Sequence, residues 1–305
     1  MTKRRRAAFL GLDDLFTPTL RGDYPDKQNT MSGELVNMGE LSKHVSDGVE
    51  YHLPYILGES VELPTICGIQ ITRFMVVEVA VALLIFILFV PLAIKMRSGK
   101  PVRGRFWNLL ESFLVFLRNE VIVPSIGKKD ADRFTPYLWT LFFFILFCNL
   151  AGLIPWFGAS PTGALATTAV LAVSAFVVLV GSGMKKFGVV GFWLGQVPKM
   201  DLPFVLAIFL KPMLFVIEIV GLFIKHVVLS VRLLANMFAG HLVLAVMLGF
   251  IAATADKIAL WIGVTFASVL ISVALNLLEL FVAFLQAYIF TFLAAIFIGM
   301  AQHQH

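Results

Sequence analysis

The sequence has only two cysteines, Cys67 and Cys148, among its 305 residues. They do not make a disulfide framework, and no cluster has the spacing of a metal site, so we expect neither a metal ion nor a cofactor. Charged residues are also scarce, at 14% against about a quarter in a soluble domain. Neither a HExxH motif nor a nucleophile-and-base motif occurs, which argues against a membrane-embedded hydrolase.

Long apolar runs are what the sequence has instead. The chain is 59% hydrophobic, and apolar runs of twenty or more residues indicate a protein that crosses the membrane several times. The runs are continuous rather than alternating, so they predict helices and an all-α polytopic membrane protein. Residues 1–70 form a polar N-terminal segment with at most a short helix around 37–51, and 71–305 a single membrane domain. Crossings are expected at about 72–95, 134–155, 163–184, 202–252 and 257–300.

The last two apolar runs are too long for an upright crossing. As one helix, residues 202–252 measure about 75 Å, more than twice the hydrocarbon core of about 30 Å. A tight hairpin would also fit, but no proline follows Pro212 and no turn signal precedes residues 252–257. The pattern therefore favours a long and strongly tilted helix, and the same argument holds for residues 257–300.

Basic residues predict the orientation in the membrane. Nine Lys or Arg residues lie between Lys95 and Arg133, whereas the loop ASPTG (159–163) has none. The positive-inside rule then places 95–133 in the cytoplasm, the N-terminus outside and the C-terminus inside. Polar residues gather on one face of residues 106–124, which predicts an amphipathic helix lying in the interface. We interpret the net charge of +5 as an orientation signal and expect no nucleic-acid partner.

A polar stripe runs along the segment 202–252. Glu218, Lys225 and Arg232 are seven residues apart, so they lie on one helical face, and Asn236 joins them. An arginine at the centre of a membrane costs from about 2.5 to more than 10 kcal/mol. Such a cost indicates a functional residue and a route for ions.

The segment 257–300 also has a stripe of polar residues along one face. Glu279 and Gln286 continue a heptad series, and His241 lies on the side of its own helix opposite to Arg232. His241 is therefore free to face Glu279, and a His–Glu pair is a plausible proton relay. Small or polar residues elsewhere serve equally well as contacts between helices or as channel lining. They are Asn149, Lys225, Ser230, Thr265, Ser272 and Asn276.

Several segments together resemble subunit a of the F-type ATP synthases. They are SDGVEYHLPY (46–55), CNLAGLIP (148–155), RLLANMFAGH (232–241) and ELFVAFLQAYIFTFL (279–293). The resemblance covers roughly residues 40–300. It implies a first crossing, an interfacial helix, two further crossings and two inclined helices that clasp a rotating ring of c subunits.

The resemblance also implies roles for particular residues. The family's essential arginine falls on Arg232 and its neighbouring amide on Asn236. The acid–histidine pair falls on Glu279 and His241, the C-terminal glutamine on Gln286, and an acid on the cytoplasmic exit side on Glu218.

By the same resemblance, the expected partners are the c-subunit ring, the b-subunit peripheral stalk, the rest of the F1Fo complex and membrane lipid. The expected location is the bacterial inner (plasma) membrane. The subunit would bind no nucleotide and would be no enzyme on its own. A stand-alone ion-coupled secondary transporter is the alternative, although no internal repeat or helix broken near its middle supports it.

Overall fold

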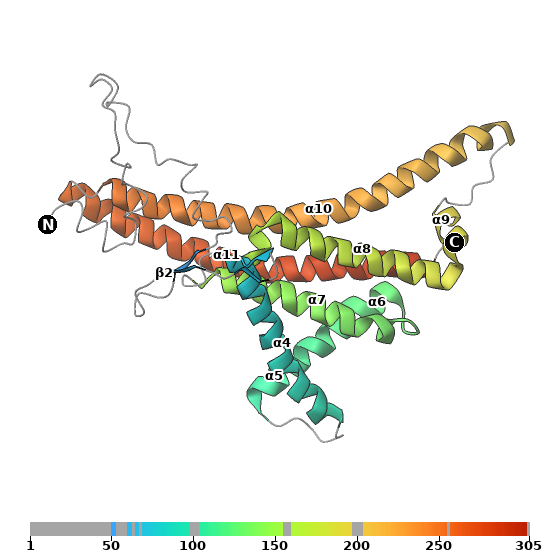
Figure 1. Cartoon of the computed structure of the whole chain (residues 1–305), viewed down its shortest axis with the longest axis horizontal. Coiled ribbons are helices and arrows are strands. Elements are labelled where there is room, and N and C mark those ends of the chain that lie inside the picture. Colours follow the sequence, from blue (N-terminus) through green and yellow to red (C-terminus); the bar gives the residue numbers. More distant parts are fainter. Residues whose placement is uncertain are drawn as a thin grey trace.

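Five long helices dominate the structure, a computed structural model that describes residues 50–52, 60–62, 65–66, 69–97, 104–154, 160–196, 204–254 and 257–303. All five are long and apolar enough to cross a membrane. They are α4 (Arg73–Arg97), α7 (Ala131–Gly152), α8 (Leu165–Phe187), α10 (Phe204–Ala253) and α11 (Ile258–Gln302) (Figure 1). The expected all-α polytopic membrane fold is therefore confirmed.

The two C-terminal helices are continuous, as their uninterrupted apolar composition predicted. α10 has 50 residues and α11 has 45, so at 1.5 Å per residue they measure about 75 and 68 Å. Both exceed the hydrocarbon core of about 30 Å more than twofold, so they fit in a bilayer only when strongly inclined. In Figure 1 the C-terminal part of α10 runs beside the first part of α11, the N-terminal part of α10 diverges from α11, and α4 descends steeply away from both.

The core lies where α7 and α8 pack against the C-terminal half of α11. α7 is the most enclosed of the five crossing helices, since 61% of the residues in its apolar 18-residue stretch are buried. Gly299 of α11 packs directly on the backbone of Ser125, and His303 Nε2 lies 2.9 Å from the Ile126 carbonyl oxygen. These contacts fasten the end of α11 to the short helix α6 (Val123–Ile126).

Other parts of the long helices carry large exposed apolar side chains. Phe266, Leu277 and Phe281 in the first half of α11 are 74%, 64% and 67% exposed. Such a surface suits lipid or the apolar face of another membrane subunit and does not suit water.

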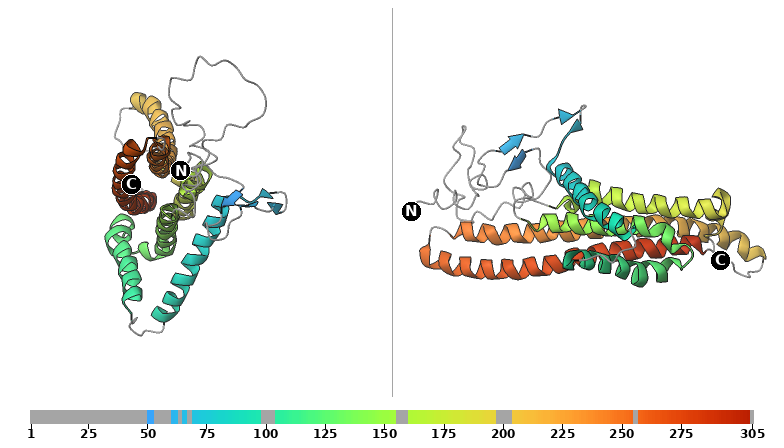
Figure 2. Two further views of the ribbon diagram at one scale, coloured as in Figure 1. Left: turned by 90° about the vertical axis from the view of Figure 1, so that its left-hand side faces the viewer. Right: turned by 90° about the horizontal axis from the view of Figure 1, so that it is seen from below.

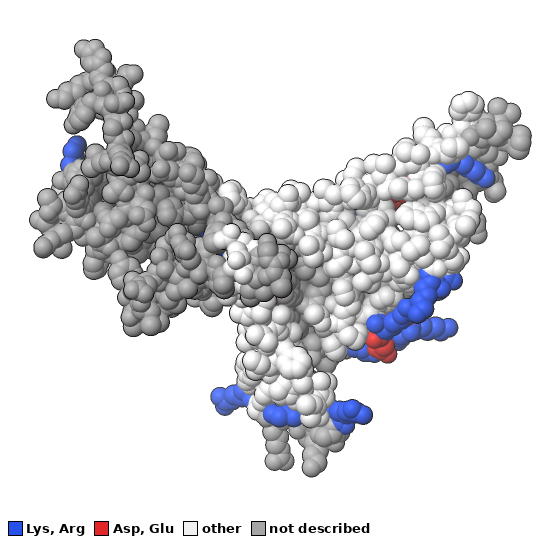
Figure 3. Space-filling view, viewed as in Figure 1, with Lys and Arg blue, Asp and Glu red and all other residues white. Residues whose placement is uncertain are grey.

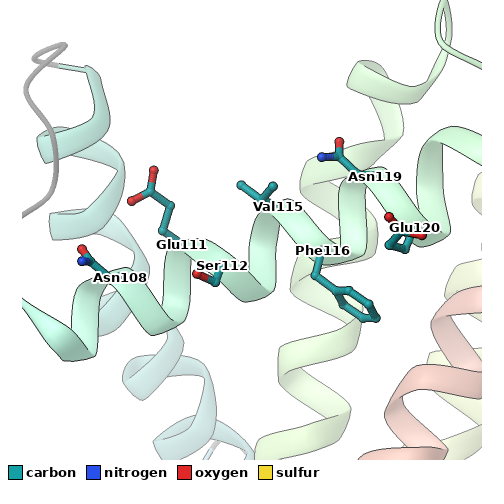
Figure 4. A pocket seen from close by; sticks show the side chains of 7 residues that line it. All are labelled: Asn108, Glu111, Ser112, Val115, Phe116, Asn119 and Glu120. Carbon is teal, nitrogen blue, oxygen red and sulfur yellow. The ribbon is translucent and has the colours of Figure 1, made fainter.

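The predicted interfacial helix is interrupted. α5 (Arg105–Phe116) continues into the π-helical turn η1 (Leu117–Ile122) and then into α6. Its polar side lines an open depression formed by Asn108, Glu111, Ser112, Val115, Phe116, Asn119 and Glu120 (Figure 4).

Arg118 turns away from this depression and pairs with Asp132 at 2.7 Å. A π-helical turn has a wider hydrogen-bonding pattern than an α-helix, so it shifts the register of the side chains that follow.

The remaining elements are short. η3 (Pro161–Gly163) precedes α8, and α9 (Val189–Leu194) follows it. Strand β1 (Glu50–His52) pairs antiparallel with β2 (Ser60–Glu62), and β3 (Thr65–Ile66) with β4 (Ile69–Gln70). The short helix considered around 37–51 falls mostly on residues outside the described ranges, and at Glu50 and Tyr51 the chain is a strand.

Charged residues gather at two places on the face shown in Figure 3. One is the tip where α4 ends and α5 begins, and the other lies beside α6, the start of α7 and the end of α8 (Figures 1 and 2). Lys186 Nζ lies 3.3 Å from Asp130 Oδ2 and joins α8 to the loop before α7. Together with the His303 contact, this pair places the end of α11 on the same side as the basic segment.

Candidate functional site

The stripe expected on α10 begins with an ion pair. Lys225 Nζ lies 3.7 Å from Glu218 Oε1, and both side chains are 41% exposed. Residues seven apart stay near one face of a helix, which brings the two charges together.

Arg232 follows one heptad later and is half-buried. Among the described residues it has no hydrogen bond and no ion pair. Val231 and Ala235 beside it are exposed, and so is Ala239 further along α10. The guanidinium therefore lies next to a surface of small and apolar side chains, which lets a second helix approach closely.

His241 and Glu279 lie together where α10 passes α11. His241 Nδ1 is 3.1 Å from Glu279 Oε1, and the two side chains are only 10% and 6% exposed. Gly240 makes this approach possible, because a Cβ atom there would lie 2.6 Å from Glu279 Oε1. The absence of a side chain at Gly240 is thus what lets the carboxylate reach the imidazole.

Both imidazole nitrogens of His241 face oxygen acceptors. Nδ1 also lies 2.9 Å from the Met237 carbonyl oxygen, and Nε2 lies 3.1 Å from the carbonyl oxygen of Gly152 at the end of α7. A neutral imidazole has one N–H donor, whereas the protonated ring donates from both nitrogens. The surroundings therefore suit a ring that gains and loses a proton next to a carboxylate.

Asn149 belongs to a buried hydrogen-bonded cluster near this pair. Its Nδ2 donates to the Ala283 carbonyl oxygen on α11 at 3.2 Å, and its Oδ1 accepts from Thr162 Oγ1 at 2.6 Å. Ser160 Oγ contacts Thr162 Oγ1 at 2.6 Å and donates to the Cys148 carbonyl oxygen at 3.0 Å. The cluster joins the end of α7 to η3 and α11, so Asn149 is at least a structural contact.

The other sequence candidates are spread over a longer distance. Gln286 is buried on the Glu279 side of α11, and Asn236 is half-buried. Ser230 is buried and donates to Thr168 Oγ1 on α8 at 3.1 Å. Thr265 and Ser272 are half-buried and Asn276 is exposed, in the less enclosed half of α11. The Asn276 side chain donates only to the Ser272 carbonyl oxygen of its own helix, at 2.9 Å.

Sequence reasoning did not single out Ser160 and Thr162, and it did not expect His226 to be buried. The two hydroxyl residues stand in an uncharged loop that gave no functional signal. His226 is buried between the rings of Phe176 and Phe297, with centroid distances of 5.2 and 5.3 Å. Its Nδ1 lies 2.9 Å from the Leu222 carbonyl oxygen, while its Nε2 is buried without a partner among the described residues. Its position beside Lys225 was the one available signal.

The sequence of the chain is similar to sequences of known proteins. The family model for the ATP synthase A chain matches residues 75–299. An ATP synthase subunit a from an Anaeromyxobacter species is 43% identical over 235 residues, which are 74% of this chain and 53% of that protein. The subunit a of Anaeromyxobacter dehalogenans is 44% identical over 216 residues, 70% of this chain and 53% of that protein.

A more distant relative is matched over more of its length. The ATP synthase subunit a of Chloroherpeton thalassium is 39% identical over 265 residues, 85% of this chain and 75% of that protein. The chain spans about half the length of the Anaeromyxobacter relatives. The matched family segment nevertheless contains all of α7, α8, α10 and nearly all of α11, and the chain therefore belongs to the ATP synthase A chain family.

Proposed function

We propose that this chain is the proton-translocating stator subunit of an ATP synthase membrane motor, in which Arg232 acts on carboxyl groups of a neighbouring rotating ring. The observation that carries the proposal is the Arg232 guanidinium, which has no hydrogen bond or ion pair among the described residues and lies beside exposed small residues. An arginine is always charged, so it cannot carry the proton itself. Its effect would therefore be electrostatic and would act on a carboxyl group of the neighbouring ring.

A carboxyl group carried past Arg232 by a ring subunit would be favoured in its ionised form. Opposite charges 4 Å apart attract by about 4 kcal/mol at an effective dielectric constant of 20. Each arriving carboxyl would then release its proton next to the guanidinium. The fixed charge also prevents protons from passing directly between the two sides of the membrane.

Two offset half-channels complete the mechanism. His241, Glu279 and Gln286, with Asn149 nearby, would line the outer one, and Glu218 the inner one, with Lys225 and Ser230 as weaker candidates. A proton would reach the ring through the His241–Glu279 pair, travel with the rotating carboxyl and leave near Glu218. A potential of 100 mV supplies about 2.3 kcal/mol per proton, so several protons are needed for each ATP.

The orientation and the partners belong to the same proposal. The basic segment 95–133 and the C-terminus would face the cytoplasm and the N-terminus the outside of a bacterial plasma membrane. The exposed apolar faces of α10 and α11 would meet the c-subunit ring. The b-subunit peripheral stalk would hold the chain against the rest of the F1Fo complex.

The alternative, an independent ion-coupled secondary transporter, would need no ring beside Arg232. A cysteine crosslink decides between the two. In a chain with Cys67 and Cys148 replaced by alanine, we expect Ala235→Cys to form a disulfide with a cysteine placed beside the ring carboxyl in the purified complex. Val170→Cys, exposed on α8, is the matched control and should form none. Absence of the Ala235→Cys product would contradict the motor.

A further inference from the structure

Glu78 is the only acidic residue in α4, whose other residues are almost all apolar. The side chain is half-buried, and its Oε1 accepts a hydrogen bond from Thr167 Oγ1 in the first turn of α8 at 2.6 Å. The second carboxylate oxygen, Oε2, makes no hydrogen bond with the described residues. It is also not fully buried by them. A carboxylate oxygen is thus fixed by Thr167, while the other stays open to a new partner.

The Thr167 hydroxyl is not forced into this contact. The next residue, Thr168, bonds back to the Ala164 and Leu165 carbonyl oxygens of its own helix at 3.3 Å, which is the usual arrangement for a threonine in an apolar helix. The Thr167 hydroxyl instead donates across to α4. It therefore holds the Glu78 carboxylate in one position between the two helices.

Glu78 lies on the other side of α7 from the His241–Glu279 pair. Val77 and Val81 of α4 belong to one cluster with Cys148 and Ala151 of α7. The neighbouring Asn149 and Gly152 face α11 and α10 instead, through Ala283 and His241. α7 thus separates the part of α4 next to Glu78 from the buried pair.

We propose that Glu78 is a proton-collecting carboxylate at the outer mouth of the half-channel that leads to His241 and Glu279. This inference rests on the proposed motor function. The carboxylate takes a proton from hydronium and releases water, then returns the proton to water inside the opening, from which it reaches the buried pair. A fixed negative charge at the mouth raises the local proton concentration.

Few other ionisable groups adjoin Glu78 on the described parts of α4, α7, η3 and α8. Arg73 lies on the same helix, and Cys148 is the ionisable group on the adjoining part of α7. η3 and residues 165–172 of α8 contain none. A change in the pH dependence on replacing Glu78 would therefore report on this carboxyl.

The test is ATP synthesis by the complete complex in sealed vesicles, measured at several pH values on the outer side of this subunit. Glu78→Gln keeps an oxygen acceptor for Thr167 but cannot bind the proton. We expect normal synthesis at low outer pH and a loss on the order of tenfold at high outer pH, where protons are scarce. Glu78→Asp should recover most of the rate, and Thr167→Val should have a smaller effect than Glu78→Gln.

Wild-type rates for Glu78→Gln at every outer pH would overturn the proposal. Failure of the Glu78→Gln complex to assemble would also overturn it. So would equal rates of ATP synthesis for Thr167→Val and Glu78→Gln at all pH values, since both results indicate a purely structural contact. Arg232→Ala in the same vesicles separates the two proposals. ATP synthesis by Arg232→Ala would contradict the motor function itself. If Arg232→Ala makes no ATP but Glu78→Gln makes ATP at the wild-type rate, only the role of Glu78 is contradicted.

Discussion

Gly240 of α10 faces the carboxylate of Glu279 on α11 so closely that a Cβ atom would lie 2.6 Å from Oε1. The same carboxylate oxygen lies 3.1 Å from His241 Nδ1. The backbone of one helix thus defines the position of an ionisable group on the other. This dependence gives a direct way to move the carboxylate without removing it.

Replacing Gly240 with alanine should displace Glu279 from His241. Because small misplacements of reacting groups are costly, we expect ATP synthesis in vesicles to fall roughly 10- to 100-fold while the complex still assembles. The matched control is Gly221→Ala on the same helix, where a Cβ atom meets nothing within 4 Å. Equal rates for the two variants would mean that the position of the carboxylate is unimportant.

Removing the carboxylate itself should slow proton uptake more severely. Glu279→Leu leaves an apolar side chain at a buried position of α11, so assembly should be preserved. Loss of a group that exchanges protons should lower synthesis by roughly 100-fold or more, and Glu279→Asp should retain part of the rate. An assembled Glu279→Leu complex with unchanged proton flux would make Glu279 only a contact between α10 and α11.

Asn149 should contribute mainly to the stability of the folded subunit within the complex. Asn149→Leu leaves the buried Thr162 hydroxyl without its present acceptor, which costs about 1–3 kcal/mol. We expect the purified complex to lose this subunit at a lower temperature than the wild type. Asn276→Leu is the matched control, since that side chain is exposed and bonds within its own helix. Equal thermal stability of both variants would argue against the cluster as a structural joint.

The sequence predicted the helices well because composition determines them directly. Residues 204–253 contain no clear turn signal, which favoured one long helix over a tight hairpin, and α10 is a continuous helix of 50 residues. The seven-residue spacing of Glu218 and Lys225 likewise predicted that they lie on one face of the helix, and they form an ion pair.

Helical periodicity predicted that His241 could face Glu279, which the structure places 3.1 Å from it, but it could not predict contacts that depend on loops or on several helices packing together. The cluster of Asn149, Thr162 and Ser160 depends on how the loop after α7 folds back over the end of that helix. The burial of His226 depends on the side chains that α8 and α11 bring to it. The π-helical turn η1 is likewise not revealed by sequence periodicity, and neither is the ion pair between Arg118 and Asp132.

Arg232 is the central residue of the proposed mechanism. A substitution can keep its positive charge while changing the shape of its side chain. Arg232→Lys keeps a positive charge but replaces a planar, always charged group with a flexible ammonium that loses its proton more readily when buried. We therefore expect Arg232→Lys to support little ATP synthesis although the complex assembles. Near-normal synthesis by this variant would mean that any positive charge is sufficient.

The most direct measurement is coupled ATP synthesis and ATP-driven proton pumping by vesicles that contain the complete complex with Arg232→Ala. Without the guanidinium, a passing carboxyl has no reason to ionise, so both activities should be abolished while the complex remains assembled. Full ATP-driven pumping by that assembled variant would contradict the account.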